Sequence, residues 1–91
     1  MKINFKFGRD LTVTEEKILG ILTATLTHSS IKVREYNNYC ELLVDGFLYT
    51  VDYPNKSQPQ YIISEGFLIQ ARSTSLFRAV MLIAHTLKVQ G

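Results

Sequence analysis

Polar and apolar residues alternate at the start of the chain. Positions 3, 5 and 7 hold Ile, Phe and Phe, whereas positions 2, 4 and 6 hold Lys, Asn and Lys. A period of two is typical of a strand with one buried face. The pattern predicts a strand over residues 2–7, which ends at Gly8.

The hydrophobic period then changes to that of a helix. Thr14, followed by two acidic residues, has the pattern of an N-cap, and Val13 is placed to contact Ile18 across the first turn. The apolar positions form one stripe. They are Ile18, Leu19, Ile21, Leu22, Ala24 and Leu26. We expect this helix to end near His28.

Two short turns organise the middle of the chain. Asp45-Gly46 stands between two apolar runs and is the strongest short-range hairpin signal in the sequence. Asn37-Asn38 provides a second two-residue turn, because asparagine tolerates positive φ. Together the two turns predict a three-stranded antiparallel meander that begins at Ile31.

The same turns define the register of the meander. If each loop has two residues, one face is almost wholly apolar. Its rows are Ile31, Val44 and Phe47; Val33, Leu42 and Tyr49; and Glu35, Cys40 and Val51. The rows of the opposite face are Arg34, Glu41 and Thr50; Tyr36, Tyr39 and Asp52; and Lys32, Leu43 and Leu48. A slip of one residue in either turn would put Arg34 or Lys32 into the core.

The segment after the meander contains both prolines. Residues 54–60 read PNKSQPQ, which predicts an exposed loop. Residues 61–71 are then either a hairpin, with a turn at Ser64-Glu65-Gly66, or one long bulged strand. The pattern of these residues does not separate the two alternatives.

A second amphipathic helix ends the chain, and Ser73 or Thr74 is its expected N-cap. Its stripe is wide enough to bury much of the helix. The stripe comprises Leu76, Phe77, Ala79, Val80, Ile83, Ala84 and Leu87, and leaves Arg78, Met81, His85 and Lys88 outside.

Because only one face of the meander is apolar, both helices are expected to pack on that face. The predicted fold is α+β, a two-layer arrangement of an antiparallel meander sheet with two helices on one face, in the order β-α-β-β-β-β-α. A chain of 91 residues that is 46% hydrophobic has room for one core. Residues 1–91 are therefore predicted to form a single α+β domain.

Composition limits the cellular location and the classes of binding partner that we expect. The net charge of +2 is far from the concentrated positive charge that phosphate neutralisation along a duplex requires. A single cysteine, Cys40, excludes an internal disulfide, and the first residues lack the apolar stretch of a signal peptide, which favours a cytoplasmic location. The longest apolar run, 79–84, is far short of the roughly 20 residues that span a bilayer, so no membrane partner is expected.

No group of residues carries a recognisable catalytic pattern. The register puts Cys40 on the core face, which favours a structural thiol over a nucleophile, and His28 and His85 are expected at the surface. Asp45 is explained by its turn, and Glu41 by a neighbouring arginine. The sequence also has no glycine-rich phosphate loop and no paired CxxC. We predict a protein that is not an enzyme and has no metal or cofactor site.

The face opposite the core is the predicted protein-binding surface, because clustered tyrosines and aliphatic side chains are typical of interfaces. Its residues are Lys32, Arg34, Tyr36, Tyr39, Glu41, Leu43 and Leu48. A simpler interpretation stays open. In it, Tyr36 and Tyr39 only cover one another beside the turn, and terminal segments shield Leu43 and Leu48.

The order of helix, meander and helix, from Glu15 to Gln90, resembles a double-stranded-RNA-binding domain. Such domains carry a lysine-rich cluster at the start of the second helix, where this chain has only Arg72 and Arg78 nearby. The resemblance implies nucleic-acid binding as the alternative function. The basic residues that would serve it are Lys2, Lys6, Lys32, Arg34, Arg72 and Arg78.

The segment 71–84, ARSTSLFRAVMLIA, is a polar cap that runs into an apolar helix, and it is similar to small bacteriophage accessory and anti-defence proteins. The resemblance implies an inhibitor or adaptor, such as an anti-CRISPR, that blocks the surface of a host protein or protein complex in the host cell cytoplasm. A further hypothesis is self-association as a homodimer, because a small sheet has an unpaired edge.

Overall fold

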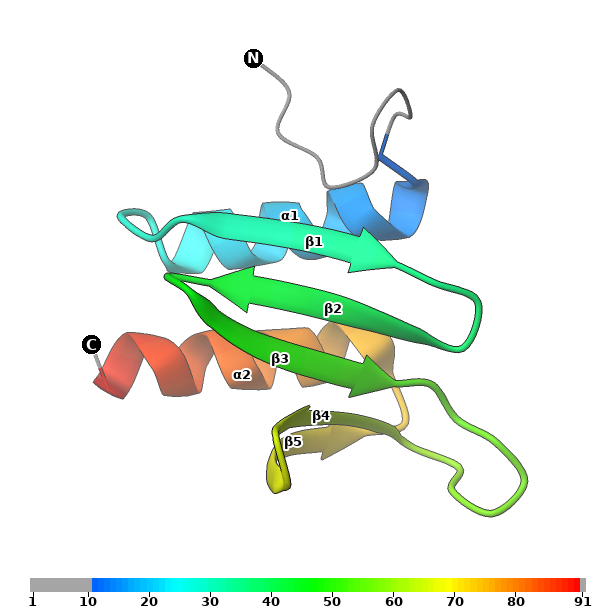
Figure 1. Ribbon diagram of the computed structural model, residues 1–91. Helices are drawn as coiled ribbons and strands as arrows, with labels where there is room; N and C mark the ends of the chain where they lie inside the picture. Colours follow the sequence, from blue (N-terminus) through cyan, green and yellow to red (C-terminus); the bar gives the residue numbers. More distant parts are fainter. Residues whose placement is uncertain (1–10, 91) are drawn as a thin grey trace.

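The computed structural model describes residues 11–90, which form two helices and five strands (Figure 1). In chain order the elements are α1 (Val13–Thr25), β1 (Ile31–Glu35), β2 (Tyr39–Val44), β3 (Phe47–Asp52), β4 (Tyr61–Glu65), β5 (Leu68–Ser73) and α2 (Leu76–Gln90). The strands pair antiparallel in the order β1-β2-β3-β4-β5, so the sheet is a simple meander. The predicted α+β class is confirmed, with five strands after α1 instead of four. The strand predicted over residues 2–7 lies outside the described residues.

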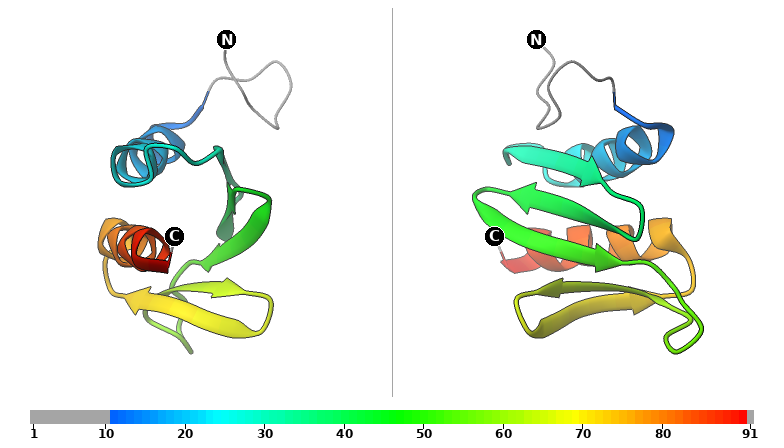
Figure 2. Two further views of the ribbon diagram at one scale, coloured as in Figure 1. Left: turned by 90° about the vertical axis from the view of Figure 1, so that its left-hand side faces the viewer. Right: turned by 45° about the vertical axis from the view of Figure 1, so that its right-hand side comes forward.

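The two helices lie side by side on one face of the sheet, as predicted (Figure 2). Helix α1 contacts β1, α2 contacts β4 and β5, and the two helices contact each other. The core lies between the helix layer and the sheet. Its fully buried large side chains are Ile18 and Leu22 from α1, Val80 and Ile83 from α2, and Cys40, Leu42, Val51 and Ile63 from the sheet.

The predicted register of the meander is confirmed at every pair. Val33 lies opposite Leu42 in β2, and Leu42 lies opposite Tyr49 in β3. Asp45 and Gly46 both have positive φ, of 51° and 86°, as a type I′ turn requires. This turn therefore has the backbone that its sequence favours.

The Asn37-Asn38 turn has the predicted position but not the predicted backbone. The Tyr36 N–H donates to the Tyr39 carbonyl at 2.8 Å, which closes a two-residue loop. Asp45 is the one non-glycine residue with positive φ among residues 11–90, so neither asparagine adopts the left-handed conformation. The register is maintained by the pairing of the strands and not by a left-handed asparagine.

The segment after the proline loop is a hairpin, and it also contains a bulge. Gly66 and Phe67 form its turn, with Gly66 at a φ of 61°, and Glu65 pairs with Leu68. The turn lies one or two residues beyond the predicted Ser64-Glu65-Gly66. The pairing shifts by one residue between Ile63 and Ser64. The hairpin alternative is therefore confirmed, and the single long strand is wrong, although a bulge is present within the hairpin.

Both helices begin at a different hydroxyl from the one predicted. Thr12, not Thr14, is the N-cap of α1, and it forms a capping box in which the Thr12 hydroxyl and the Glu15 carboxylate each accept a backbone N–H from the other residue. Ser75 precedes α2, where its hydroxyl accepts the Arg78 N–H at 3.4 Å, and Ser73 is the last residue of β5. Helix α1 also ends at Thr25, three residues before the predicted His28.

Candidate functional site

The seven residues of the predicted binding surface lie on one side of the sheet, opposite the helices. We call this side the outer face. No helix or strand within residues 11–90 covers it (Figure 2). Six of the seven side chains are half-buried, and Leu48 is 48% exposed. The members are Lys32, Arg34, Tyr36, Tyr39, Glu41, Leu43 and Leu48, from β1, the turn after it, β2 and β3.

Tyr36 and Tyr39 form a stacked pair on the outer face. Their rings stack with centroids 4.6 Å apart and an interplanar angle of 17°. The Tyr36 hydroxyl donates to the Glu41 carboxylate at 3.1 Å, and the Arg34 guanidinium lies 5.2 Å from the centre of the Tyr36 ring. Partial burial and the bond to Glu41 raise the pKa of Tyr36 above its ordinary value. A partner would therefore meet an aromatic pair whose geometry is already restrained.

The outer face continues onto β4 and β5, which the sequence did not show. Ile62 pairs with Asp52 of β3 on one side and with Arg72 of β5 on the other. Ile69 pairs with Ser64, and it is 50% exposed. Sequence reasoning missed both isoleucines because the bulge in this hairpin hides the alternation of faces.

The basic residues proposed for nucleic-acid binding do not form one surface. Lys32, Arg34 and Arg72 share the outer face, whereas Arg78 lies in the first turn of α2, in the helix layer. Lys2 and Lys6 lie outside the described residues. Glu41 and Asp52 stand among the cations of the outer face, so the described part of this face is mixed in charge.

A network of hydrogen bonds closes one end of the space between the helices and the sheet. We call this end the sealed end. Glu15 is fully buried, and its carboxylate accepts the N–H of Thr12 at 2.7 Å and the N–H of Glu35 at 2.6 Å. The Glu35 carboxylate accepts the hydroxyls of Thr12 and Tyr53, at 2.8 and 2.7 Å. Burial and then the bond to Glu35 raise the pKa of Tyr53. The T-x-x-E spacing of Thr12 and Glu15 was the available signal for this network.

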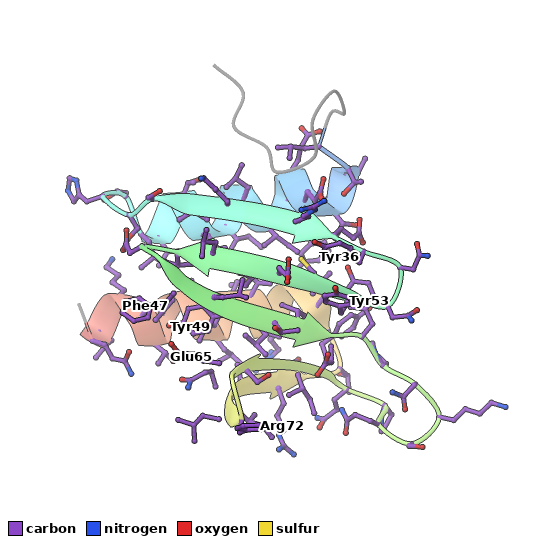
Figure 3. The ribbon with its side chains drawn as sticks, in the orientation of Figure 1. Tyr36, Phe47, Tyr49, Tyr53, Glu65 and Arg72 are labelled. Atoms are coloured by element: carbon purple, nitrogen blue, oxygen red, sulfur yellow. The ribbon has the colours of Figure 1, made fainter. Side chains whose placement is uncertain are left out.

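The opposite end is open. A groove of about 610 Å³ lies between the C-terminal ends of α1 and α2, the β2–β3 turn and the end of β4. Its lining includes Phe47, Tyr49, Glu65, Leu87 and Lys88, and we call it the open groove. Figure 3 shows the first three of these side chains together at one end of the sheet, and Tyr36 and Tyr53 at the other.

The cysteine and the two histidines do not come together in a catalytic site. Cys40 is fully buried on the core face, as predicted, and His28 and His85 are exposed. Within residues 11–90 no cluster of three or more His, Cys, Asp or Glu side chains could hold a metal ion. Neither described helix has the length and apolar character needed to cross a membrane.

Comparison of the chain with models of protein families, with curated proteins and with solved structures found no match. Its function is therefore inferred from its own surfaces.

Proposed function

We propose that this protein is a small, non-enzymatic binding module that blocks the surface of a partner protein with the outer face of its sheet. The observation that carries the proposal is the row of aromatic and aliphatic side chains on a sheet face that no described helix covers. These side chains are Tyr36, Tyr39, Leu43, Leu48, Ile62 and Ile69. Protein interfaces combine such an apolar centre with polar and charged residues at the rim.

The stacked tyrosines are the expected centre of the interface. Tyrosine has few rotatable bonds and large contact area, so it loses little conformational entropy on binding. Tyr36 is already restrained by Tyr39, Glu41 and Arg34 before a partner arrives. Such preorganisation lowers the entropic cost of association.

The partner that we propose is a host protein or protein complex, and the module acts as a phage-type inhibitor or adaptor, with an anti-CRISPR role among the specific forms. This part of the proposal rests on the resemblance to small phage proteins that the sequence of residues 71–84 suggests. Nucleic-acid binding is supported less well, because three cations and two carboxylates share the described part of the outer face.

A pull-down from bacterial lysate with a variant pair tests the proposal. The double variant Tyr36→Ala/Tyr39→Ala should retain at least about tenfold less partner than the wild type, because aromatic residues at the centre of an interface contribute most of its binding energy. The matched control, Met81→Ala/His85→Ala, changes two exposed residues of α2 and should retain the partner.

Two outcomes would contradict this assignment. Equal recovery of the partner by the tyrosine variant and the wild type would exclude the outer face as the binding surface. Loss of recovery after nuclease treatment, together with affinity that falls steeply with salt, would assign the face to nucleic acid. Circular dichroism of both variants shows whether the fold is retained.

A further inference from the structure

The open groove has a mainly apolar floor and a wall that carries an acid and an aromatic ring. Leu26, Val44 and Tyr49 form the floor, and each is at least nine-tenths buried. Phe47 belongs to the wall and is 60% exposed, although it lies on the helix-facing side of β3. An apolar ring left in solvent beside a buried floor is a surface on which another side chain can pack.

Of the two carboxylates that line the groove, Glu65 is the one that makes no hydrogen bond with a described residue. The Asp45 carboxylate accepts the backbone N–H of Ser30 at 2.8 Å, which ties the β2–β3 turn to the segment before β1. Lys88 lies in the last turn of α2, where a cation is favoured by the helix dipole. The Glu65 carboxylate has no hydrogen bond and no ion pair with any described residue.

Glu65 lines the groove together with Tyr49, an aromatic residue at its base. Burial is the main cause that raises the pKa of Tyr49, and the charge of the nearby Glu65 carboxylate adds to it. Phe47 and Tyr49 lie on the same side of β3, two residues apart, and both line the groove with Glu65 (Figure 3). A carboxylate that lines a groove together with two aromatic rings suits a planar cation, which can stack on a ring and bond to the acid at once.

We infer that the open groove binds an arginine side chain of a partner protein, with the guanidinium on Glu65 and its apolar stem against Phe47 and Tyr49. The assignment rests on complementarity of charge and shape. Arginine is favoured over lysine because its guanidinium forms paired hydrogen bonds with a carboxylate and stacks on aromatic rings. This site lies on the helix side of the sheet and is separate from the outer face.

The surroundings of the groove favour a protein over a free small cation. The hairpin tip next to Glu65 carries Phe67, which is fully exposed, and Leu68, which is 68% exposed. Together with Phe47 they place apolar surface around a charged centre. Protein interfaces have this arrangement, whereas a free cation would leave these residues in water.

Nuclear magnetic resonance titration of the ¹⁵N-labelled protein tests the inference. The probe is N-acetyl-arginine methylamide, and its neutral match is N-acetyl-citrulline methylamide, in which a urea replaces the guanidinium. The arginine probe should shift the amide signals of Phe47, Tyr49, Glu65 and Leu87 with a Kd on the order of 1 mM, and citrulline should bind at least about tenfold more weakly.

Two glutamine variants test whether Glu65 is the carboxylate that binds the guanidinium. Glu65→Gln should weaken binding of the arginine probe by about tenfold, because it replaces a charge-assisted bond with a neutral one. Glu41→Gln, on the outer face, should leave the affinity unchanged. The tyrosine variant of the outer face should also bind the probe normally, so failure of this inference is distinguishable from failure of the proposed function.

Three results would overturn the assignment. The first is an absence of shifts at the groove residues, and the second is equal affinity for the arginine and citrulline probes. The third is tighter binding of N-acetyl-lysine methylamide than of the arginine probe, which would assign the site to a different cation.

Discussion

Each end of the space between the helices and the sheet contains a glutamate, and the two glutamates differ in burial and in hydrogen bonding. At the sealed end Glu15 is fully buried, and both of its carboxylate oxygens accept backbone N–H groups. In the open groove Glu65 is half-buried and has no hydrogen bond or ion pair with a described residue. The same side chain therefore supports the fold at one end, and at the other it is available to a ligand.

The difference follows from which elements meet at each end. The N-terminus of α1 meets the end of β1 at the sealed end, so the N–H of the N-cap Thr12 and the N–H of Glu35 in β1 both lie beside the Glu15 carboxylate. The C-terminal turns of both helices meet two hairpin ends at the open groove, where no described residue donates a hydrogen bond to Glu65. A buried carboxylate needs hydrogen-bond donors. Glu15 has them at the sealed end, and Glu65 has none from the described residues in the open groove.

Substitution of the two glutamates should give the largest contrast. Glu15→Ala leaves two partly buried N–H groups without their acceptor and removes a fully buried side chain, so the free energy of unfolding should fall by about 2–4 kcal/mol. Glu65→Ala should change it by less than about 0.5 kcal/mol. Urea denaturation of both variants measures the difference, and equal effects would show that the two ends do not differ in this way.

Substitution of a tyrosine should also lower the free energy of unfolding more at the sealed end than in the open groove, by a smaller amount than substitution of the glutamates. Tyr53→Phe removes the bond to Glu35 and should lower the free energy of unfolding by about 1 kcal/mol. No hydrogen bond joins the Tyr49 hydroxyl to another described residue, so Tyr49→Phe should cost less than about 0.5 kcal/mol. A larger loss for Tyr49→Phe would reverse the assignment of the two ends, and urea denaturation again measures it.

Alkaline pH should weaken the sealed end. The pKa of Tyr53 is higher in the folded protein than in the unfolded chain, so the unfolded chain loses this proton first. The stabilisation is complete below a pH of about 10 and declines as the pH rises above it. Urea midpoints between about pH 9 and about pH 11 should fall less for Tyr53→Phe than for the wild type. Identical slopes would exclude Tyr53 as a source of the pH dependence.

Acid should have the smallest effect, at the β2–β3 turn beside the open groove. The Ser30 N–H, followed by the Ser29 side chain, lowers the pKa of Asp45 in the folded protein. The stabilisation is present above the unfolded pKa of about 4 and is lost as the pH falls through the lower, folded value. Asp45→Asn keeps a residue that tolerates positive φ, and should reduce the acid dependence of the urea midpoint. An unchanged acid dependence would contradict this role.

Local signals predicted the sheet better than they predicted the helix ends. The register could be read because two turns and a period of two agreed. A slip of one residue would have put Lys32 or Arg34 into the core. The N-caps predicted for both helices were wrong because several hydroxyls stand close together. Thr12 and Thr14, or Ser73 and Ser75, have the same capping chemistry, and contacts with distant residues such as Glu35 separate them.

The sequence by itself determined the α+β class, the meander with its register and the placement of both helices on one face. Each of these follows from the spacing of residues near one another in the chain. Tertiary structure alone decided which glutamate is sealed and which is open. Glu15 meets Glu35 and Thr12 meets Glu35 across 20 and 23 positions, and the open groove joins the ends of both helices to two hairpins. Such distant groups meet only when the whole chain packs, because no periodic pattern links them.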